Sequence, residues 1–281
     1  MESPGTHILL INCPDESGLI YKVSKIVYHH NLNVVSNAEF VERKFSHFFM
    51  RTEFFGETDL ETLLDELRNV LPKQSEIKLT NGRKKRIVIL ATREYHCLSD
   101  LLVRHQFNDI NVDISGVISN YNDLRELTEK FHIPYFFTDH KDKTREDHDA
   151  EILKILRQLD PDFLVLAKYM RILSPGFVNK FQNRIINIHH SFLPAFTGAN
   201  PYQKAYERGV KIIGATAHFV SEELDEGPII AQRVIPADHS HDAKEMAQAG
   251  RDVEKNVLAH ALKLVSNDRV FVFNNKTIIF D

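Results

Sequence analysis

The sequence predicts a two-domain α/β protein of 281 residues, with a βαββαβ unit in residues 1–82 and a doubly wound, mostly parallel sheet in residues 83–281. Two observations predict this class. The first 80 residues alternate β-rich runs with two amphipathic helical stripes in the order of the βαββαβ unit. After Arg86, continuous apolar runs alternate with helical segments, which is typical of a parallel sheet with helices on both faces.

Composition excludes several classes of function. Apolar residues make up 43% and charged residues 26% of the chain, as in ordinary globular proteins. A net charge of −4 argues against nucleic-acid binding, and no apolar run reaches the roughly 20 residues of a membrane span. The N-terminus MESPGTH does not resemble a secretory signal. Cys13 and Cys97 are far apart and lack metal-ligand spacing, so we expect a reducing, cytoplasmic location.

The first domain is predicted element by element. A strand ends at a loop, Cys13 to Gly18, that contains Pro, Gly and helix-capping residues. Thr58 to Glu61 has the S/T-x-x-E pattern of a capping box and opens the second helix, which Pro72 ends. In order, the sequence predicts strand 7–12, a helix with Leu19, Ile20, Val23, Ile26 and Val27 on its apolar stripe, strands 31–41 and 46–55, the helix after the capping box, and strand 76–80.

The basic cluster Arg83 to Arg86 is read as a solvated linker into the second domain. Ser174 and Pro175 are a good helix start, with Ser as cap and Pro at the first position. A hairpin is predicted from Arg269 to Phe280, because Asn274 and Asn275 tolerate left-handed backbone. The remaining predicted elements are strands 87–91, 112–118, 133–137, 163–167, 185–189, 212–220 and 229–235, and helices 97–104, 124–131, 152–159 and 242–265.

The end of strand 185–189 carries the clearest chemistry. Alternate side chains of a strand share a face, so Asn187 and His189 point the same way. In open parallel sheets, ligands bind outside the carboxyl ends of the strands. An amide donor beside an imidazole can stabilise an oxyanion and move a proton. A hydrogen-bonded pair that merely finishes the strand explains the same residues. His190 faces the opposite way and is read as a structural or supporting residue.

A strand and an acidic loop supply a third polar group. The segment Gly214 to Val220 leads into a loop that ends in Gly227 and Pro228, and Asp225 could fold back over the crevice to orient an imidazole. A solvated turn carboxylate is the alternative. His218 is read as a near-core or supporting histidine. No carboxylate or cysteine stands at metal-ligand spacing around His189, so no metal is expected there.

A slot for a flat ring is a further candidate. Leu166 to Pro175 leaves a buried strand and enters a capped helix, with apolar side chains and exposed backbone at the junction. Ordinary core packing explains these residues about as well.

Taken together, these segments resemble the folate-dependent formyltransferases. The resemblance rests on Asn187-Ile188-His189, the Ser191-x-Leu193-Pro194 loop and Leu224-Asp225-Glu226-Gly227-Pro228, and it covers the chain from about Arg86 onward. It implies a Rossmann-like formyltransferase domain in which Asn187, His189 and Asp225 are catalytic. It also implies a folate pocket formed by Met170, Arg171, Ile172, Leu173, Leu224 and Gly227, with His190 and His218 in support.

Two longer segments narrow the resemblance. Ile188 to Phe196 and Arg208 to His218 are similar to the formyltetrahydrofolate deformylase family, which also carries an N-terminal ferredoxin-like ACT domain. Pro14-Asp15-x-x-Gly18-Leu19 resembles the first loop of that domain, so Asp15 and Gly18 are candidates for an effector loop. The domain commonly binds amino acids at a dimer interface, and some members of the family respond to glycine or methionine. The resemblance therefore implies a homo-oligomer, either a dimer or a tetramer, and an amino-acid effector, although a docking domain without a ligand is equally open.

The implied activity is hydrolysis of 10-formyltetrahydrofolate to formate and tetrahydrofolate, without a cofactor beyond the folate substrate. Related transformylases hold a ribonucleotide phosphate with a Gly-Ser-Asn loop after the first strand. Here the corresponding loop, Ala91 to Cys97, contains no glycine, and water can be the acceptor. Two alternatives stay open. One is formyl transfer to an amine, as in glycinamide ribonucleotide transformylase, and the other is a non-catalytic sensor of amino acids and folate.

Overall fold

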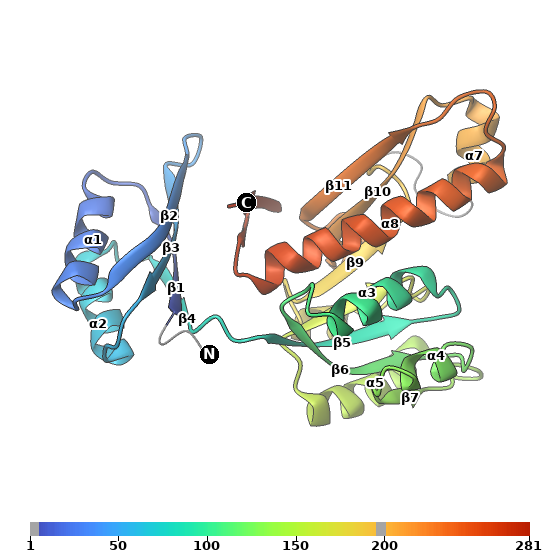
Figure 1. The fold of residues 1–281 in the computed structure, drawn as a ribbon, viewed down its shortest axis with the longest axis horizontal. Coiled ribbons are helices and arrows are strands. Elements are labelled where there is room, and N and C mark those ends of the chain that lie inside the picture. Colours follow the sequence, from blue (N-terminus) through green and yellow to red (C-terminus); the bar gives the residue numbers. More distant parts are fainter. Residues whose placement is uncertain (1–5, 195–200) are drawn as a thin grey trace. The chain divides into compact units, whose positions relative to one another are not determined.

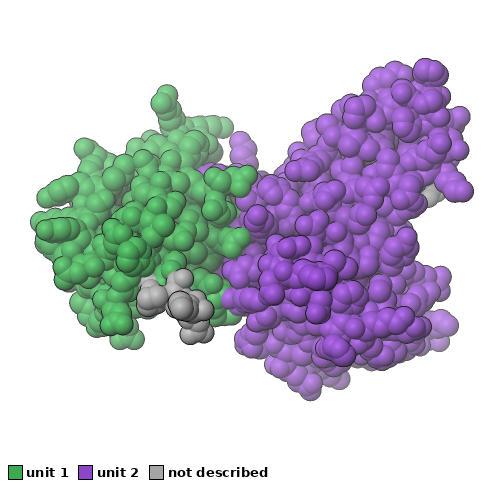
Figure 2. Space-filling view, in the orientation of Figure 1, with its two compact units in different colours: residues 1–83, 267–271, 280–281 green, residues 84–266, 272–279 purple. Residues whose placement is uncertain are grey.

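The computed structural model describes residues 6–194 and 201–281, which form two compact units (Figures 1 and 2). Unit 1 holds the described residues up to Arg83 together with Asn267–Phe271 and Phe280–Asp281. Unit 2 holds the described residues of Lys84–Ser266 together with Val272–Ile279. Within this described part of the chain, every helix is too short or too polar to span a bilayer.

Unit 1 contains a four-stranded antiparallel sheet in the order β2-β3-β1-β4. Its two helices and the apolar side chains beneath them form a single core against this sheet. The predicted βαββαβ order is confirmed. The elements are β1 (Thr6–Pro14), α1 (Leu19–His29), β2 (Asn33–Glu42), β3 (His47–Phe55), α2 (Leu60–Val70) and β4 (Glu76–Thr80).

The predicted capping residue of α2 is wrong by one position. The N-cap is Asp59, whose carboxylate accepts hydrogen bonds from the Glu61 backbone N–H at 3.1 Å and the Thr62 hydroxyl at 2.6 Å. The hydroxyl of Thr58 instead lies 2.6 Å from Nδ1 of His30. A carboxylate at the N-cap also complements the helix dipole, so the helix begins one residue later than the capping-box pattern predicts.

The C-terminal segment of unit 1 contacts the same sheet. Arg51 on β3 donates from Nε to the Asp268 carbonyl at 3.1 Å. Lys78 and Thr80 on β4 each lie 3.0 Å from the Asp268 carboxylate. The Phe271 ring packs edge-on against Phe49, with ring centroids 5.5 Å apart. A segment from the end of the chain therefore packs against the N-terminal sheet.

Unit 2 contains a seven-stranded sheet in the order β11-β10-β9-β8-β5-β6-β7. The strands from β9 to β7 run parallel, whereas β10 and β11 pair antiparallel. The predicted mostly parallel sheet is confirmed. Its strands are β5 (Lys85–Ala91), β6 (Val112–Ser119), β7 (Tyr135–Phe137), β8 (Phe163–Ala167), β9 (Ile185–His189), β10 (Ile212–Phe219) and β11 (Ile229–Pro236).

Helices cover this sheet. The apolar side chains of α5 and α6 pack into one core with β5, β6, β8 and β9, while α8 contacts β9, β10, β11, α3 and α7 (Figure 1). The predicted hairpin is confirmed as β12 (Val270–Phe273) and β13 (Lys276–Ile279). The helices are α3 (His96–Gln106), α4 (Arg125–Glu129), α5 (Arg145–Leu159), α6 (Pro175–Lys180), α7 (Pro201–Arg208) and α8 (Ala243–Ser266).

Two helices depart from the sequence prediction. Helix α5 begins seven residues before the predicted start at residue 152, because Thr144 caps a highly charged first turn. The backbone N–H of Asp147 donates a hydrogen bond to the Thr144 hydroxyl. Helix α7 was not predicted. It is eight residues long and mostly polar, and the apolar face that packs into the core consists of Tyr202 and Ala205, which is too short a pattern to predict a helix.

Candidate active site

A cavity of about 690 Å³ lies at the carboxyl ends of β8 and β9 and beside the loop that follows β10. This is the edge of a parallel sheet at which ligands are expected. Asn187, His189, His218 and Asp225 line one part of the cavity, and Met170 to Leu173 line another. A third part lies against α7 and α8.

The pairing of β9 with β10 brings Asn187 directly opposite His218. Asn187 Nδ2 lies 3.2 Å from His218 Nε2, and His218 Nδ1 lies 2.9 Å from the Phe219 carbonyl oxygen. The carbonyl can only accept, so Nδ1 carries the proton and Nε2 accepts from the amide. One amide hydrogen of Asn187 is thus engaged by His218, and the second can be donated to a substrate oxygen.

Asp225 connects the two imidazoles. Its Oδ1 lies 3.2 Å from Nδ1 of His189 and 3.6 Å from Nε2 of His218. Burial alone would raise the pKa of this carboxyl, but the hydrogen bond and the charge of His189 outweigh burial and hold the pKa well below its usual range. Asp225 is therefore a carboxylate at neutral pH.

The loop that carries Asp225 is fixed at its base. A Cβ at Gly227 would lie 1.8 Å from the Phe219 carbonyl oxygen, so only glycine permits this approach. Phe219 N–H donates to the Pro228 carbonyl at 2.9 Å, and the Asn275 side chain donates to the Glu226 carbonyl at 3.0 Å. Asp225 itself has a φ of 60°, a left-handed conformation that aspartate tolerates.

His189 is oriented for proton transfer. Its Nδ1 faces Asp225, and its buried Nε2 has no hydrogen-bond partner among the residues that the structure describes. The ring of His190 stacks on it, with centroids 5.0 Å apart. Burial, followed by the charges of Lys168 and His189, lowers the pKa of His190 to about 4, so His190 is neutral at physiological pH.

The Met170 to Leu173 segment has the features of a slot for a flat ring. Met170 is 65% exposed and Leu224, from the acidic loop, 63% exposed, and both line the cavity. Lys168 turns the chain out of β8 with a φ of 60°, and its carbonyl accepts from the Thr92 hydroxyl at 2.7 Å. At the other end, Ser174 N–H donates to the buried Asp149 carboxylate at 2.7 Å. The segment is therefore held at both ends.

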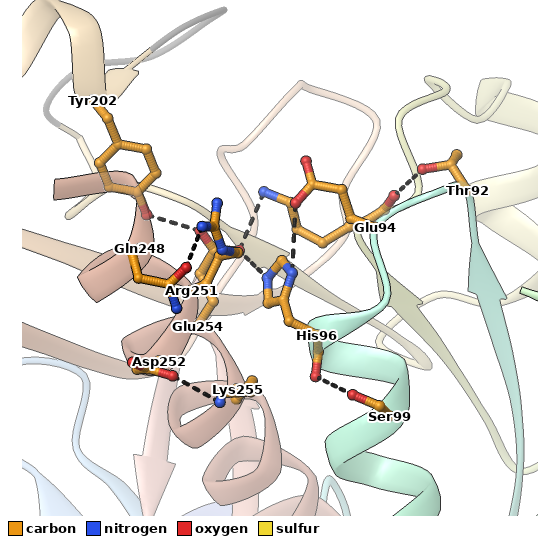
Figure 3. A network of polar contacts seen from close by, with 11 residues as sticks. Thr92, Glu94, His96, Ser99, Tyr202, Gln248, Arg251, Asp252, Glu254 and Lys255 are labelled. Carbon is orange, nitrogen blue, oxygen red and sulfur yellow. Dashed lines mark hydrogen bonds and ion pairs between the residues drawn. The ribbon is translucent and has the colours of Figure 1, made fainter. Parts of the chain in front are cut away.

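A buried network around Glu254 was not predicted from the sequence (Figure 3). Glu254 is 1% exposed and accepts from His96 Nε2 and the Tyr202 hydroxyl, each at 2.8 Å, while the Lys168 ammonium lies 3.2 Å away. Burial would raise the pKa of Glu254, but the hydrogen bond from His96 and the charge of Lys168 lower it to about 2. One signal could have revealed it, because Glu254 falls on the apolar stripe of α8, where a lone carboxylate needs partners.

The same network contains a set of metal-ligating atoms. His96, Cys97 and Glu254 each offer one such atom, all within 4.8 Å of one another. The Lys168 ammonium already neutralises Glu254 and opposes a second cation there. The expectation that no metal binds near His189 stays a prediction.

The structure brings most predicted site residues together. Asn187, His189, His190, His218 and Asp225 line the cavity, as do Met170, Arg171, Ile172, Leu173 and Leu224. Gly227 is not among the residues that line the cavity. Its lack of a side chain lets the loop backbone pass close to the Phe219 carbonyl. Ala195 and Phe196, the end of one predicted segment, lie outside the described residues.

The predicted effector loop lies in unit 1. Gly18 is the N-cap of α1 with a φ of 87°, and Asp15 N–H donates to the Ser46 carbonyl at 2.8 Å. The positive φ explains the glycine, and the bond from Asp15 ties the loop to the residue just before β3.

Comparisons with known proteins show the families that the two domains resemble. Residues 85–262 match the family model described as formyl transferase, and residues 7–72 match the ACT domain model. Formyltetrahydrofolate deformylase from Haemophilus influenzae is 53% identical over 97% of this chain and 98% of its own. The protein of the same name from Escherichia coli K12 is 52% identical over 99% and 100%.

Two solved structures show the same relation. A formyltetrahydrofolate deformylase from Pseudomonas syringae superposes with a TM-score of 0.95 at 40% identity, over 100% of this chain and 96% of that one. Glycinamide ribonucleotide transformylase 1 from Symbiobacterium toebii superposes with a TM-score of 0.68 at 28% identity, over 72% and 97%. The second likeness leaves more than a quarter of this chain unmatched.

Proposed function

The chain belongs to the family of formyltetrahydrofolate deformylases, and we propose that Asn187, His189 and Asp225 carry out the reaction of this family. That reaction is the hydrolysis of 10-formyltetrahydrofolate to formate and tetrahydrofolate. One observation carries the proposal. His189 faces the ionised Asp225 carboxylate through Nδ1 and is left with Nε2 as a base beside the Asn187 amide.

The hydrolysis proceeds through a tetrahedral intermediate. Nε2 of His189 takes a proton from water as the water oxygen attacks the formyl carbon, and Asp225 stabilises the resulting imidazolium. Asn187 Nδ2–H donates to the formyl oxygen as it becomes an oxyanion, and the protonated His189 shares this role. His189, directly or through a water, then returns the proton to N10. The carbon–nitrogen bond breaks, and formate and tetrahydrofolate leave.

The remaining residues of the cavity bind the substrate. Met170 and Leu224 present apolar surface for the pterin ring, and the backbone of the Met170 to Leu173 segment supplies hydrogen-bonding groups. His218 orients the Asn187 amide. The side chains supply the base, the acid and the oxyanion donor, so the chemistry needs no cofactor beyond the folate substrate.

Single substitutions test the roles of the three residues. We expect Asn187→Ala, His189→Ala and Asp225→Asn each to lower kcat by about 10² to 10³, the typical loss of one oxyanion donor or proton-transfer group. Binding of tetrahydrofolate, measured by isothermal titration, should change little. Glu226→Gln is the matched control, because Glu226 is exposed, adjoins Asp225 and does not line the cavity. Wild-type formate release by any of the three variants would refute its role.

Unit 1 supports a homo-oligomer, either a dimer or a tetramer. Strand β2 is an edge strand with the exposed apolar side chains Val34, Val35 and Phe40. Edge strands of this kind pair with another copy of the sheet. We expect Val35→Lys to shift the mass measured by light scattering towards the monomer. Tyr28→Lys, on the exposed face of α1, should leave the mass unchanged, and a monomeric wild type would contradict the proposal.

The ACT domain also suggests an amino-acid effector that binds at the Asp15 to Gly18 loop. Glycine and methionine are suitable probes. Isothermal titration of the full chain should show binding of one of them, and Asp15→Asn should weaken it. Formate release measured with and without the amino acid would show whether binding regulates turnover, while the absence of binding would favour a domain that only docks.

Two further expectations complete the proposal. The domains are assigned to residues 1–82 and 83–281, and the family models matched to residues 7–72 and 85–262 fall within them. The protein is assigned to the cytoplasm, because Cys13 and Cys97 are free, buried thiols that suit a reducing compartment.

A further inference from the structure

One part of the cavity has no role in the hydrolysis described above. The reaction needs only the folate and a water, yet the cavity continues past His189 and His190 to α7 and α8. Its lining there contains Glu94, Lys168, Tyr202, Gln203, Lys244, Arg251 and Glu254. This is where a second, larger reactant would approach the formyl carbon.

We infer that Tyr202 restricts the formyl acceptor to water, by holding its ring against α8 where an amine would have to enter. The rings of His189, His190 and Tyr202 follow one another, with centroids 5.0 Å and then 6.3 Å apart. Tyr202 is thus the second ring from the imidazole that removes the proton. The inference rests on the proposed roles of Asn187, His189 and Asp225.

Two contacts with α8 fix the position of Tyr202. Its hydroxyl donates to Glu254 Oε1 at 2.8 Å, and Glu254 also accepts from His96 (Figure 3). The Lys168 ammonium lies 3.2 Å from the same carboxylate. Burial, and then the charge of Glu254, raises the pKa of Tyr202 far above its usual range, so the hydroxyl keeps its proton and stays a donor. A Cβ at Gly250 would lie 2.0 Å from the Tyr202 hydroxyl. The ring lies against α8 only because residue 250 is glycine.

Amines need to be excluded, because a neutral amine is a better nucleophile than water. Attack by water gives tetrahydrofolate and formate, whereas attack by an amine gives tetrahydrofolate and an N-formyl amine. In both cases the acceptor loses a proton to His189 Nε2, and N10 gains one. Tyr202 narrows the space for the larger nucleophile. The Lys168 ammonium already pairs with the Glu254 carboxylate, which is therefore not available to bind a protonated amine.

A competition experiment tests the inference. Wild type, Tyr202→Ala and Tyr202→Phe are given 10-formyltetrahydrofolate with glycinamide or hydroxylamine, and formate and the N-formyl product are measured together after subtraction of the reaction without enzyme. We expect Tyr202→Ala to raise the ratio of formyl amine to formate at least about tenfold, the range in which one pocket contact discriminates. Tyr202→Phe keeps the ring and should keep the wild-type ratio. An unchanged ratio in Tyr202→Ala overturns the inference.

The readout and a double variant make the result independent of folding and of the catalytic assignment. The ratio of the two products does not depend on how much enzyme is folded. In the double variant Tyr202→Ala/His189→Ala, both products should disappear. If both persist with a raised ratio, Tyr202 controls the acceptor but the role proposed for His189 is wrong.

Discussion

In the proposed mechanism, four polar side chains from β9, β10 and the acidic loop divide the chemistry between two pairs. His189 and Asp225 handle the proton, because the carboxylate holds Nδ1 and leaves Nε2 as base. Asn187 and His218 handle the oxygen, because the imidazole accepts one amide hydrogen and fixes the direction of the other. Asp225 Oδ1 also lies 3.6 Å from His218 Nε2, so the two pairs adjoin the same carboxylate.

The neighbouring His190 affects how the stability of the protein depends on pH, because its pKa is lowered in the folded state. Its pKa falls from the usual 6.5 to about 4, so the folded protein favours the neutral ring. Between these values the unfolded chain binds a proton that the folded chain does not. The stabilising contribution is therefore complete above pH 6.5 and is lost as the pH falls towards 4.

A pH series on a His190 variant checks this sign. Between about pH 7.5 and pH 5, the free energy of unfolding of the wild type should fall by roughly 2 kcal/mol more than that of His190→Asn. Urea unfolding followed by circular dichroism at both pH values measures the difference. Equal losses in the two proteins would mean that His190 titrates normally in the folded state.

The sequence predicted the residues proposed to be catalytic, but it did not predict the buried network of polar side chains beside them. Asn187 and His189 follow from alternation in a strand that ends at a parallel-sheet edge, and Asp225 from the resemblance and its loop. Glu254 was missed because its partners His96, Lys168 and Tyr202 come from three distant segments. No local sequence pattern predicts contacts between residues so far apart in the chain.

Single helices and strands were predictable where burial or a cap dictates them. Strands β8 and β9 were predicted to the residue, because short apolar runs bounded by turn residues suit a sheet buried on both faces. The start of α6 at Pro175 followed from Ser174, whose hydroxyl accepts from Phe177 N–H at 3.3 Å. Helix α7 was not predicted because its apolar face contains only Tyr202 and Ala205, whose core partners lie elsewhere in the sequence.

The acidic loop gives a prediction that concerns an element rather than a functional group. Gly227→Ala inserts a methyl group 1.8 Å from the Phe219 carbonyl oxygen, so the loop must shift and carry Asp225 away from His189. We expect a fall in kcat of about 10-fold or more, consistent with the sensitivity of catalysis to misplacement. Steady-state formate release measures the effect.

Gly176→Ala on α6 is the matched control for this variant. A Cβ there meets no atom within 4 Å, and alanine favours a helix over glycine by about 0.5–1 kcal/mol. We expect unchanged turnover and equal or slightly greater stability. Equal losses of activity in the two glycine variants would show that the Gly227 effect is not specific to the loop.

For the whole molecule, the sequence predicted two domains in succession. It did not predict that a segment near the C-terminus belongs to the first unit. Asn267–Phe271 belongs to unit 1, although it follows all of α8. The predicted hairpin from Arg269 to Phe280 was correct as local structure, but its first residues contribute to another unit. Contacts such as Phe271 with Phe49 depend on three-dimensional placement, which periodicity does not report.

Substitution of Asp268 tests how much the segment Asn267–Phe271 stabilises unit 1. The side chain of Asp268 is almost fully buried, bonded to Lys78 and Thr80, and its φ of 51° suits aspartate or asparagine better than alanine. We expect Asp268→Ala to lower the free energy of unfolding by about 1–3 kcal/mol and Asp268→Asn to lower it less. Urea unfolding of both variants measures this, and equal stability of wild type and Asp268→Ala would contradict it.

The position of Asn267–Phe271 has a consequence for biosynthesis. The ribosome completes β1, β3 and β4 early but makes the segment that binds Arg51, Lys78 and Thr80 only after all of α8. At ordinary rates of translation, this delay is on the order of ten seconds or more. During that interval, Phe49 lacks its contact with Phe271 and Arg51 lacks its hydrogen bond to Asp268. A chaperone that binds nascent chains would therefore bind at this part of the sheet.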